Sequence, residues 1–293
     1  MDWQCTGLRW PEDPGGPALG WRKGTRTRAS PLAYGTELGF RAAGERRCSG
    51  ARGNACPVAA VVPATSTGGR CPECGRLDRA HSVAADTIPD DPRTYRVYLA
   101  WFGPGMVKVG ITAEERDAAR LREQGAVVFS WLGRGPLMAA RRAEEVLRAA
   151  LGVPDRIPYA RKRAVRAELP APGERAAEVA ELYGRAAALE GRGWPEALER
   201  LPFGAVDHAG IFGLGPASGP VRAVTGLVDG GAVAGRLVAA AGPDLHLDTG
   251  PQGILVVDTR LMTGWSLTAA GATAGVSVPT VAVGGGAAQD GLF

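Results

Sequence analysis

Residues 96–112 read RVYLAWFGPGMVKVGIT, two apolar runs rich in β-branched residues and joined by a Phe-Gly-Pro-Gly turn. In both runs, large apolar side chains recur at every second position, which is the period of a strand in a half-buried sheet. The sequence therefore predicts a β-hairpin at this place.

The residues that follow predict that strands and helices alternate. Thr112 and Glu115 have the spacing of a capping box, which predicts a helix over about 113–124. Residues 126–132, AVVFSWL, read as a third strand, and Gly125 fits a left-handed cap between the helix and this strand.

A second helix is predicted over 137–151, where an apolar face carries Glu144 at its margin. The central module is thus ββαβα, and the fold class is α+β. Short strands broken by glycine occur near both ends of the chain, and we expect them to pair in one small antiparallel β domain into which the module is inserted. The expected segments are N-terminal β-strands at 1–44, a zinc-binding segment at 45–92, the module at 93–166, a helical bridge at 167–202, a C-terminal β segment at 203–268 and a weakly ordered tail at 269–293.

The net charge of +4 is unevenly distributed along the 293 residues. Residues 93–166 hold 15 Lys and Arg against 7 Asp and Glu, a balance of +8, whereas residues 167–293 hold 7 against 13, a balance of −6. Because a guanidinium fork binds two phosphate oxygens at once, the central region is predicted to bind nucleic acid. A high-GC genome also produces arginine-rich chains, and this alternative stays open. The arginines expected to contact nucleic acid are Arg116, Arg122, Arg141, Arg142 and Arg148.

Membrane insertion and secretion are not expected. No stretch approaches the roughly 18 unbroken apolar residues of a membrane span, and the N-terminus lacks the basic-then-apolar order of a signal peptide. Five cysteines, an odd number, suit a reducing compartment better than a disulfide framework. We therefore expect a cytoplasmic protein.

Four of the cysteines predict a structural zinc site. Cys71 and Cys74 form CPEC, whose two thiolates can face one tetrahedral ion, and Cys48 and Cys56 upstream would complete the ligand set. His81 is an alternative ligand in place of one of the upstream pair. A redox-active CxxC pair and unligated thiols are the other interpretations.

The central module resembles the GIY-YIG nuclease superfamily. The resemblance is carried by VYL at 97–99, KVGIT at 108–112, Arg120 in the next helix and Glu144 in the one after it. The resemblance is to the divergent variety of this superfamily, in which the second motif reads KIG.

The sequence is even more similar to a bacterial domain family of unknown function, whose members read roughly VYLA…KVGIT…RWIDQGA. Here the last element is RLREQGA at 120–126. Cysteine pairs before VYLA and the strand-rich LVVDTRLMTGWSL at 255–267 extend the resemblance over about 45–267.

The superfamily resemblance implies hydrolysis of a phosphodiester bond with one divalent ion. Tyr98 would orient or deprotonate the attacking water, Arg120 would clamp the phosphate, and Glu144 would bind magnesium or manganese. Lys108 replaces the second tyrosine of the superfamily, and at an ordinary pKa of about 10.4 it would bind phosphate and be a poor base. The asparagine that usually completes such sites has no clear match, although Tyr159 and Lys162 lie nearby in the sequence.

Two functions from different classes follow. The chain is a metal-dependent endonuclease that acts on DNA or RNA, or it is an inactive zinc-containing module that binds nucleic acid or protein. The simpler alternatives are that Tyr98 is an ordinary strand aromatic and that Arg120 and Glu144 form an ion pair between helices.

Overall fold

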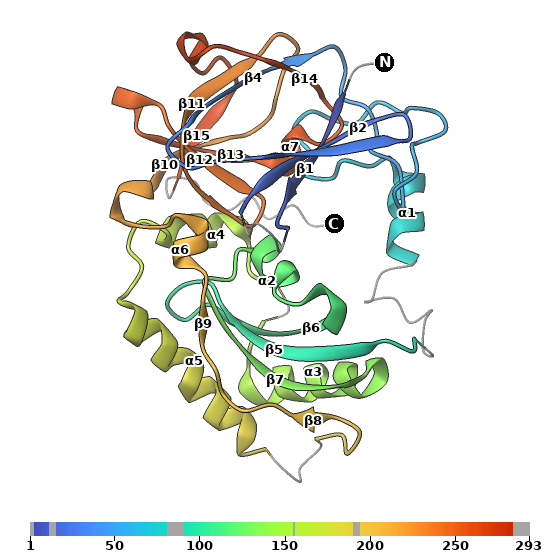
Figure 1. The fold of residues 1–293 in the computed structure, drawn as a ribbon, viewed down its shortest axis with the longest axis vertical. Helices are drawn as coiled ribbons and strands as arrows, with labels where there is room; N and C mark the ends of the chain where they lie inside the picture. Colours follow the sequence, from blue (N-terminus) through green and yellow to red (C-terminus); the bar gives the residue numbers. More distant parts are fainter. Residues whose placement is uncertain (1–2, 12–15, 81–90, 155, 190–193, 284–293) are drawn as a thin grey trace. The chain divides into compact units, whose positions relative to one another are not determined.

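The computed structural model describes residues 3–11, 16–80, 91–154, 156–189 and 194–283. The chain forms two compact units: unit 1 contains residues 1–82 and 211–293, and unit 2 contains residues 83–210 (Figure 1). Each unit has its own sheet and core. In the described part of the chain no helix combines the length and the apolar character needed to cross a bilayer.

Unit 1 is built on a ten-stranded sheet with the order β15-β10-β13-β12-β11-β4-β14-β1-β2-β3. Its strands are β1 (Gln4–Arg9), β2 (Ala18–Lys23), β3 (Arg26–Pro31), β4 (Glu37–Ala43), β10 (Pro220–Val224), β11 (Ala232–Ala241), β12 (Asp244–Asp248), β13 (Ile254–Asp258), β14 (Ser266–Ala269) and β15 (Thr280–Ala282). Its helices are α1 (Pro72–Ala80), α7 (Thr259–Met262) and the short α6 (Ala209–Phe212) at the boundary with unit 2.

Strands from the two ends of the chain interleave in this sheet. β4 pairs with β11 on one side and with β14 on the other, and β1 lies between β14 and β2. The pairing of early with late strands agrees with the sequence prediction. The sheet is larger than the small antiparallel domain that we expected, however, and it is mixed, because β10 and β13 run parallel.

The C-terminal segment is built into the sheet as far as the structure describes it. β15 pairs antiparallel with β10, and Val278 is buried against the core of unit 1. The weakly ordered tail expected from residue 269 is therefore wrong for 269–283, and residues 284–293 lie outside the described part. The sequence did not predict this strand, because the small Ala, Gly and Thr residues around it give only a weak apolar pattern.

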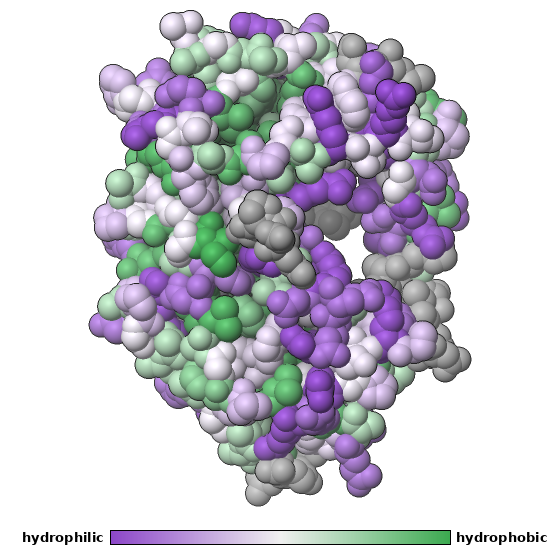
Figure 2. Space-filling view, in the orientation of Figure 1, coloured by the Kyte–Doolittle hydropathy of each residue, from purple (hydrophilic) through white to green (hydrophobic). Residues whose placement is uncertain are grey.

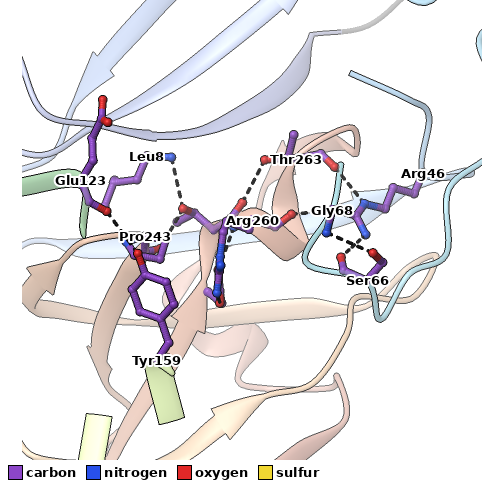
Figure 3. Close-up of polar contacts among 11 residues, drawn as sticks. Leu8, Arg46, Ser66, Gly68, Glu123, Tyr159, Pro243, Arg260 and Thr263 are labelled. Atoms are coloured by element: carbon purple, nitrogen blue, oxygen red, sulfur yellow. Dashed lines mark hydrogen bonds and ion pairs between the residues drawn. The ribbon is translucent and has the colours of Figure 1, made fainter. Parts of the chain in front are cut away.

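The cysteine-rich segment belongs to unit 1 and is held there by Arg46. This side chain is only 2% exposed. Its Nη1 donates to the carbonyl oxygens of Pro63 and Ser66, both at 2.6 Å, and its Nε and Nη2 donate to those of Thr263 and Arg260, both at 2.8 Å (Figure 3). One guanidinium thus satisfies backbone carbonyls in the loop and at the end of α7 together.

Unit 2 has a five-stranded sheet with the order β6-β5-β7-β8, in which β9 also pairs with β7. Its strands are β5 (Thr94–Trp101), β6 (Val107–Ala113), β7 (Val128–Pro136), β8 (Glu199–Arg200) and β9 (Val206–Asp207). Its helices are α2 (Ala119–Gln124), α3 (Leu137–Leu151), α4 (Tyr159–Val165) and α5 (Pro172–Ala187). The described element order confirms the hairpin, the third strand and the helix over 137–151.

Side chains that alternate along β5 contact different helices of unit 2. Tyr98, Ala100 and Phe102 pack in one apolar cluster with Leu121 of α2. Trp101, at the alternate parity, donates from Nε1 to Glu178 of α5 at 2.6 Å. Helices α3 and α5 contact each other and both contact β5 and β7. The segment expected as a helical bridge at 167–202 is in fact part of unit 2, because α5 packs on this sheet.

The helix predicted over 113–124 begins later than the capping signal suggested. Thr112 pairs across the hairpin with Arg96, so β6 continues to Ala113, and the Thr112 hydroxyl caps no helix. A single 3-10 turn follows, and Asp117 then takes a left-handed φ of 35°. Cross-strand pairing has here overridden a local helix-start signal. The helix ends as predicted, with Gly125 at φ 72°.

Candidate functional site

The four predicted zinc ligands come together in unit 1. The Sγ atoms of Cys48, Cys56, Cys71 and Cys74 all lie within 4.8 Å of one another. A tetrahedral zinc ion with bonds of about 2.3 Å needs sulfur atoms separated by about 3.8 Å. The four sulfur atoms are therefore close to the separation that zinc binding requires. The fifth cysteine, Cys5, is buried in the main core and is not part of this group.

Backbone geometry positions these sulfur atoms for a cation. The amides of Gly50 and Cys71 donate to the Cys48 Sγ at 3.3 and 3.1 Å. Gly50 has a φ of 76°, and a Cβ there would lie 1.8 Å from the Asn54 carbonyl oxygen, so only glycine fits this turn. Amide donors directed at sulfur stabilise thiolates, which are the form that binds metal.

The thiols do not ionise independently. Backbone amides of Ala60 and Val58 lower the pKa of Cys56 to about 7 despite some opposing burial. Burial, together with the three neighbouring cysteines, raises the pKa of Cys74 to about 12. Burial also raises the pKa of Cys48. Four thiolates at this separation repel one another, and a bound divalent cation removes that repulsion. The donor set therefore fits zinc; His81 lies outside the described residues.

The second group of predicted site residues lies in unit 2 around Tyr98. Tyr98 on β5 is directly opposite Gly110 on β6, and a Cβ at position 110 would lie 2.4 Å from the Tyr98 hydroxyl oxygen. The glycine of KVGIT therefore makes room for the phenol. Gln124, the last residue of α2, donates from Nε2 to the same hydroxyl at 2.9 Å.

The surroundings of Tyr98 are those of a core residue. Its side chain is 1% exposed, and its ring packs edge-on against Trp131 at 6.3 Å between centroids. Burial raises the pKa of Tyr98; the hydrogen bond from Gln124 and the charge of Arg120 oppose this, and the charge of Glu144 reinforces it. The raised pKa keeps the phenol protonated, and its oxygen accepts the hydrogen bond from Gln124.

Lys108 and Glu144 are both half-buried and influence each other electrostatically. Burial lowers the pKa of Lys108, and the Arg120 guanidinium lowers it further, while Glu144 opposes the shift. Burial raises the pKa of Glu144, which Lys108 opposes. By register, Lys108 lies two residues from Gly110 on the same face of β6. Tyr98, Lys108, Arg120 and Glu144 thus come from four elements and form one electrostatic group.

Arg120 lies on the exposed side of this group. Its Nη1 is 3.7 Å from a carboxylate oxygen of Glu123, and Arg116 binds the same carboxylate at 2.7 Å. No direct ion pair joins Arg120 to Glu144 within the described residues. A phosphate group would compete with Glu123 for two guanidinium groups at this point.

One of the predicted nucleic-acid contacts is wrong. Arg122 is only 7% exposed, because the six-residue helix α2 turns Leu121 and Arg122 inward. Its guanidinium acts on a buried neighbour instead: together with burial, it lowers the pKa of His208. Arg116 and Arg142 are exposed, and Arg141 and Arg148 are half-buried.

Gln124 and Lys162 were not among the predicted site residues. Lys162 is buried, donates from Nζ to the Gln124 carbonyl at 2.9 Å and lies 3.7 Å from the centroid of the Phe102 ring. Tyr159 donates to the Glu123 carbonyl at 3.4 Å (Figure 3). Two residues of α4 therefore fix the end of α2 and, through Gln124, the Tyr98 hydroxyl. The only sequence signal for Tyr159 and Lys162 was their position after Glu144, where the superfamily places the asparagine that completes its sites.

Comparisons with known proteins identify one family. No curated protein and no solved structure matches the chain. A family model described as "Protein of unknown function (DUF2797)" matches residues 35–267, most of the chain, and this range includes the four clustered cysteines and the group around Tyr98. The chain therefore belongs to the DUF2797 family.

Proposed function

We propose that this protein acts on nucleic acid and hydrolyses phosphodiester bonds with a divalent metal, using the group around Tyr98 in a GIY-YIG-like module, while zinc on the four cysteines stabilises unit 1. The observation that carries the proposal is the arrangement of Tyr98, Lys108, Arg120 and Glu144, which come from four separate elements and in which Arg120 and Glu144 lie close enough to influence the pKa of both Tyr98 and Lys108. Proton transfer, phosphate binding and metal binding each have a chemically suitable group there.

The proton acceptor in this proposal is Lys108 rather than Tyr98. A general base works best when its pKa lies near the working pH. Burial and Arg120 lower the pKa of Lys108, whereas burial raises that of Tyr98. Tyr98 would instead hold its hydroxyl in a fixed place through Gln124. The replacement of the second tyrosine by lysine is then a change of base and leaves the chemistry possible.

Glu144 is the candidate ligand for magnesium or manganese. The only group of three or more acidic, histidine or cysteine side chains that the described residues bring together is the cysteine cluster, so Glu144 offers a single carboxylate. Magnesium is commonly held by one or two carboxylates plus phosphate oxygens of the substrate. The residues therefore fit a metal that binds together with nucleic acid, and the metal would stabilise charge on the phosphate.

The second candidate is an inactive module that binds nucleic acid. It is favoured by the burial of Tyr98, at 1% exposure, and by the single carboxylate. In that case Arg116 and Arg120 would hold phosphate without any bond being broken.

The deciding experiment is incubation of the purified protein with end-labelled DNA and RNA, single-stranded and duplex, with magnesium or manganese. Endonuclease activity predicts internal products that require the metal. Glu144→Gln should abolish them, and Lys108→Met should reduce the rate by about 100-fold or more, which is the ordinary contribution of a general base.

Glu145→Gln is the matched control. Glu145 is exposed on the same helix, about 100° around the axis from Glu144, and the change removes the same charge. Equal loss of cleavage in both variants would contradict the assignment of Glu144. Salt-sensitive binding with no products in any metal would instead support the inactive module.

A further inference from the structure

The N-terminal hairpin of unit 1 carries an unusual concentration of positive charge. Between Gly16 and Thr36 the sequence has four basic residues and no acidic one. Arg22 is buried, and its Nη1 donates to the Asn54 carbonyl at 3.4 Å. The other three, Lys23, Arg26 and Arg28, are exposed. This hairpin, β2 and β3, lies outside the residues 35–267 that define the family.

The register of the hairpin places the three exposed cations on one face. Lys23 is directly opposite Arg26, and Trp21 is directly opposite Arg28. Residues two apart in a strand point to the same side and are about 7 Å apart, so these four side chains form one patch, two on each strand, at the edge of the sheet. Hydrophilic residues gather over this part of the molecule in Figure 2, around the positions of β1 and β2 in Figure 1.

Two indole rings lie beside the cations. The Arg28 guanidinium is 4.4 Å from the centroid of the Trp3 ring and 5.8 Å from that of Trp21. Both tryptophans are half-buried, and Trp21 Nε1 donates to the Ser30 hydroxyl at 3.0 Å. The Trp21 ring is thus held by a hydrogen bond and the Trp3 ring lies against Arg28, while part of each residue reaches solvent.

This arrangement works against the stability of the hairpin. Like charges directly opposite each other destabilise a strand pair, and none of the three exposed cations forms an ion pair in the part of the chain that the structure describes. Charged residues on an edge strand do discourage aggregation, and β3 is an edge. That purpose explains single charges on β3. It does not explain a Lys-Arg pair next to two ordered indoles.

We propose that the face formed by Trp3, Trp21, Lys23, Arg26 and Arg28 binds single-stranded nucleic acid. A patch of neighbouring cations attracts a phosphate backbone, and indole surfaces accept unstacked bases, which a duplex does not present. The inference shares with the proposed function only the identity of the ligand. It concerns a surface in unit 1, separate from the group around Tyr98.

The test is binding of a fluorescently labelled 12-nucleotide single strand, measured by anisotropy at several salt concentrations. The Glu144→Gln background keeps the ligand intact. Lys23→Gln, Arg26→Gln and Arg28→Gln combined should weaken binding at least tenfold and reduce the salt slope by about 2, because each phosphate that is no longer neutralised lowers the slope by roughly 0.7. Arg26→Lys with Arg28→Lys should retain most of the salt slope.

The matched control removes the same charge from three other arginines of unit 1, of which Arg76 and Arg236 are exposed and Arg47 is half-buried. Arg47, Arg76 and Arg236 each pair with a carboxylate, of Glu45, Glu73 and Asp248 respectively. Their combined replacement by Gln should leave binding within about twofold. Equal weakening by both triple variants, or equal competition by polyglutamate and by unlabelled strand, would overturn the proposal.

A second measurement does not depend on the folding of variants. Crosslinking of a bromouridine-substituted strand to the unmodified protein should give adducts on Trp3 or on residues 16–31, mapped by mass spectrometry. Adducts confined to unit 2 would overturn the hairpin inference and leave the proposed function standing. Adducts on the hairpin of a protein that cleaves no nucleic acid would support the inference while the nuclease proposal fails.

Discussion

Tyr98 and Gly110 are paired across β5 and β6 so closely that the phenol occupies the place of a side chain at position 110. A Cβ there would lie 2.4 Å from the hydroxyl oxygen and 2.5 Å from Cζ. Gln124, at the end of α2, holds the Tyr98 hydroxyl through a hydrogen bond. The glycine of the KVGIT motif is thus explained by packing against the tyrosine of the VYLA motif.

Gly110→Ala should therefore destabilise the protein by about 1–3 kcal/mol, the usual range for an overpacked core. The Tyr98 ring has to move, and its hydrogen bond with Gln124 has to lengthen or break. Urea unfolding followed by tryptophan fluorescence measures the change.

Gly184→Ala is the control for the Gly110 prediction. Gly184 lies in α5, and a Cβ at this position meets nothing within 4 Å. This change should stabilise the protein by up to about 1 kcal/mol, as expected for glycine in a helix. A neutral Gly110→Ala variant would show that the close approach to Tyr98 is easily relieved.

Metal content should follow the cysteine cluster. Cys71→Ser or Cys74→Ser should lower zinc, measured by mass spectrometry on protein purified without chelator, to background. Cys5→Ala should leave it at one ion per chain, because Cys5 is outside the cluster. Zinc should also be released as the pH falls, because protons compete for the thiolates. Retention of zinc by both serine variants would contradict the four-thiolate site.

The sequence was most informative where a pattern is local and repeated. Alternation of apolar residues located β5 and β6, and the helical period located α3 with Glu144 at the edge of its buried face. The cysteine spacing identified a set of four that the fold does bring together. Each of these features depends on neighbours within about fifteen residues, or on one uncommon residue type.

The errors occurred where a distant partner decides the outcome. Thr112 stays in β6 because Arg96 pairs with it, and Arg122 is buried although its charge predicted exposure. The burial of Tyr98 and the lowered pKa of Lys108 both result from packing against other elements, which composition does not reveal. Such packing is the reason why the proposed base is Lys108 and not Tyr98.

Arg46 should be among the least replaceable residues of unit 1. Arg46→Met leaves the carbonyls of Pro63, Ser66, Arg260 and Thr263 without this donor, and we expect a loss of about 3–5 kcal/mol in the free energy of unfolding. Thermal unfolding followed by circular dichroism measures it. Arg47→Gln, at a half-buried neighbour whose guanidinium pairs with the exposed Glu45 carboxylate, should change stability by less than about 1 kcal/mol. Similar small losses for both variants would show that water replaces the buried guanidinium.

The stability of unit 2 should depend on pH through Glu144. Burial raises the folded-state pKa of Glu144 above its ordinary value of about 4.3, so the folded protein holds this proton more tightly than the unfolded chain does. The stabilisation that results is complete below about pH 4 and is lost as the pH rises through the folded-state pKa. At pH 7 the partly buried Glu144 carboxylate therefore lowers the free energy of unfolding. Glu144→Gln should raise the melting temperature at this pH. The difference should disappear near pH 4, where both side chains are neutral, and Glu145→Gln should show no such convergence. A Glu144→Gln variant that melts below the unmodified protein at pH 7 would mean that the attraction from Lys108 outweighs burial and that the two charges already form a stabilising pair.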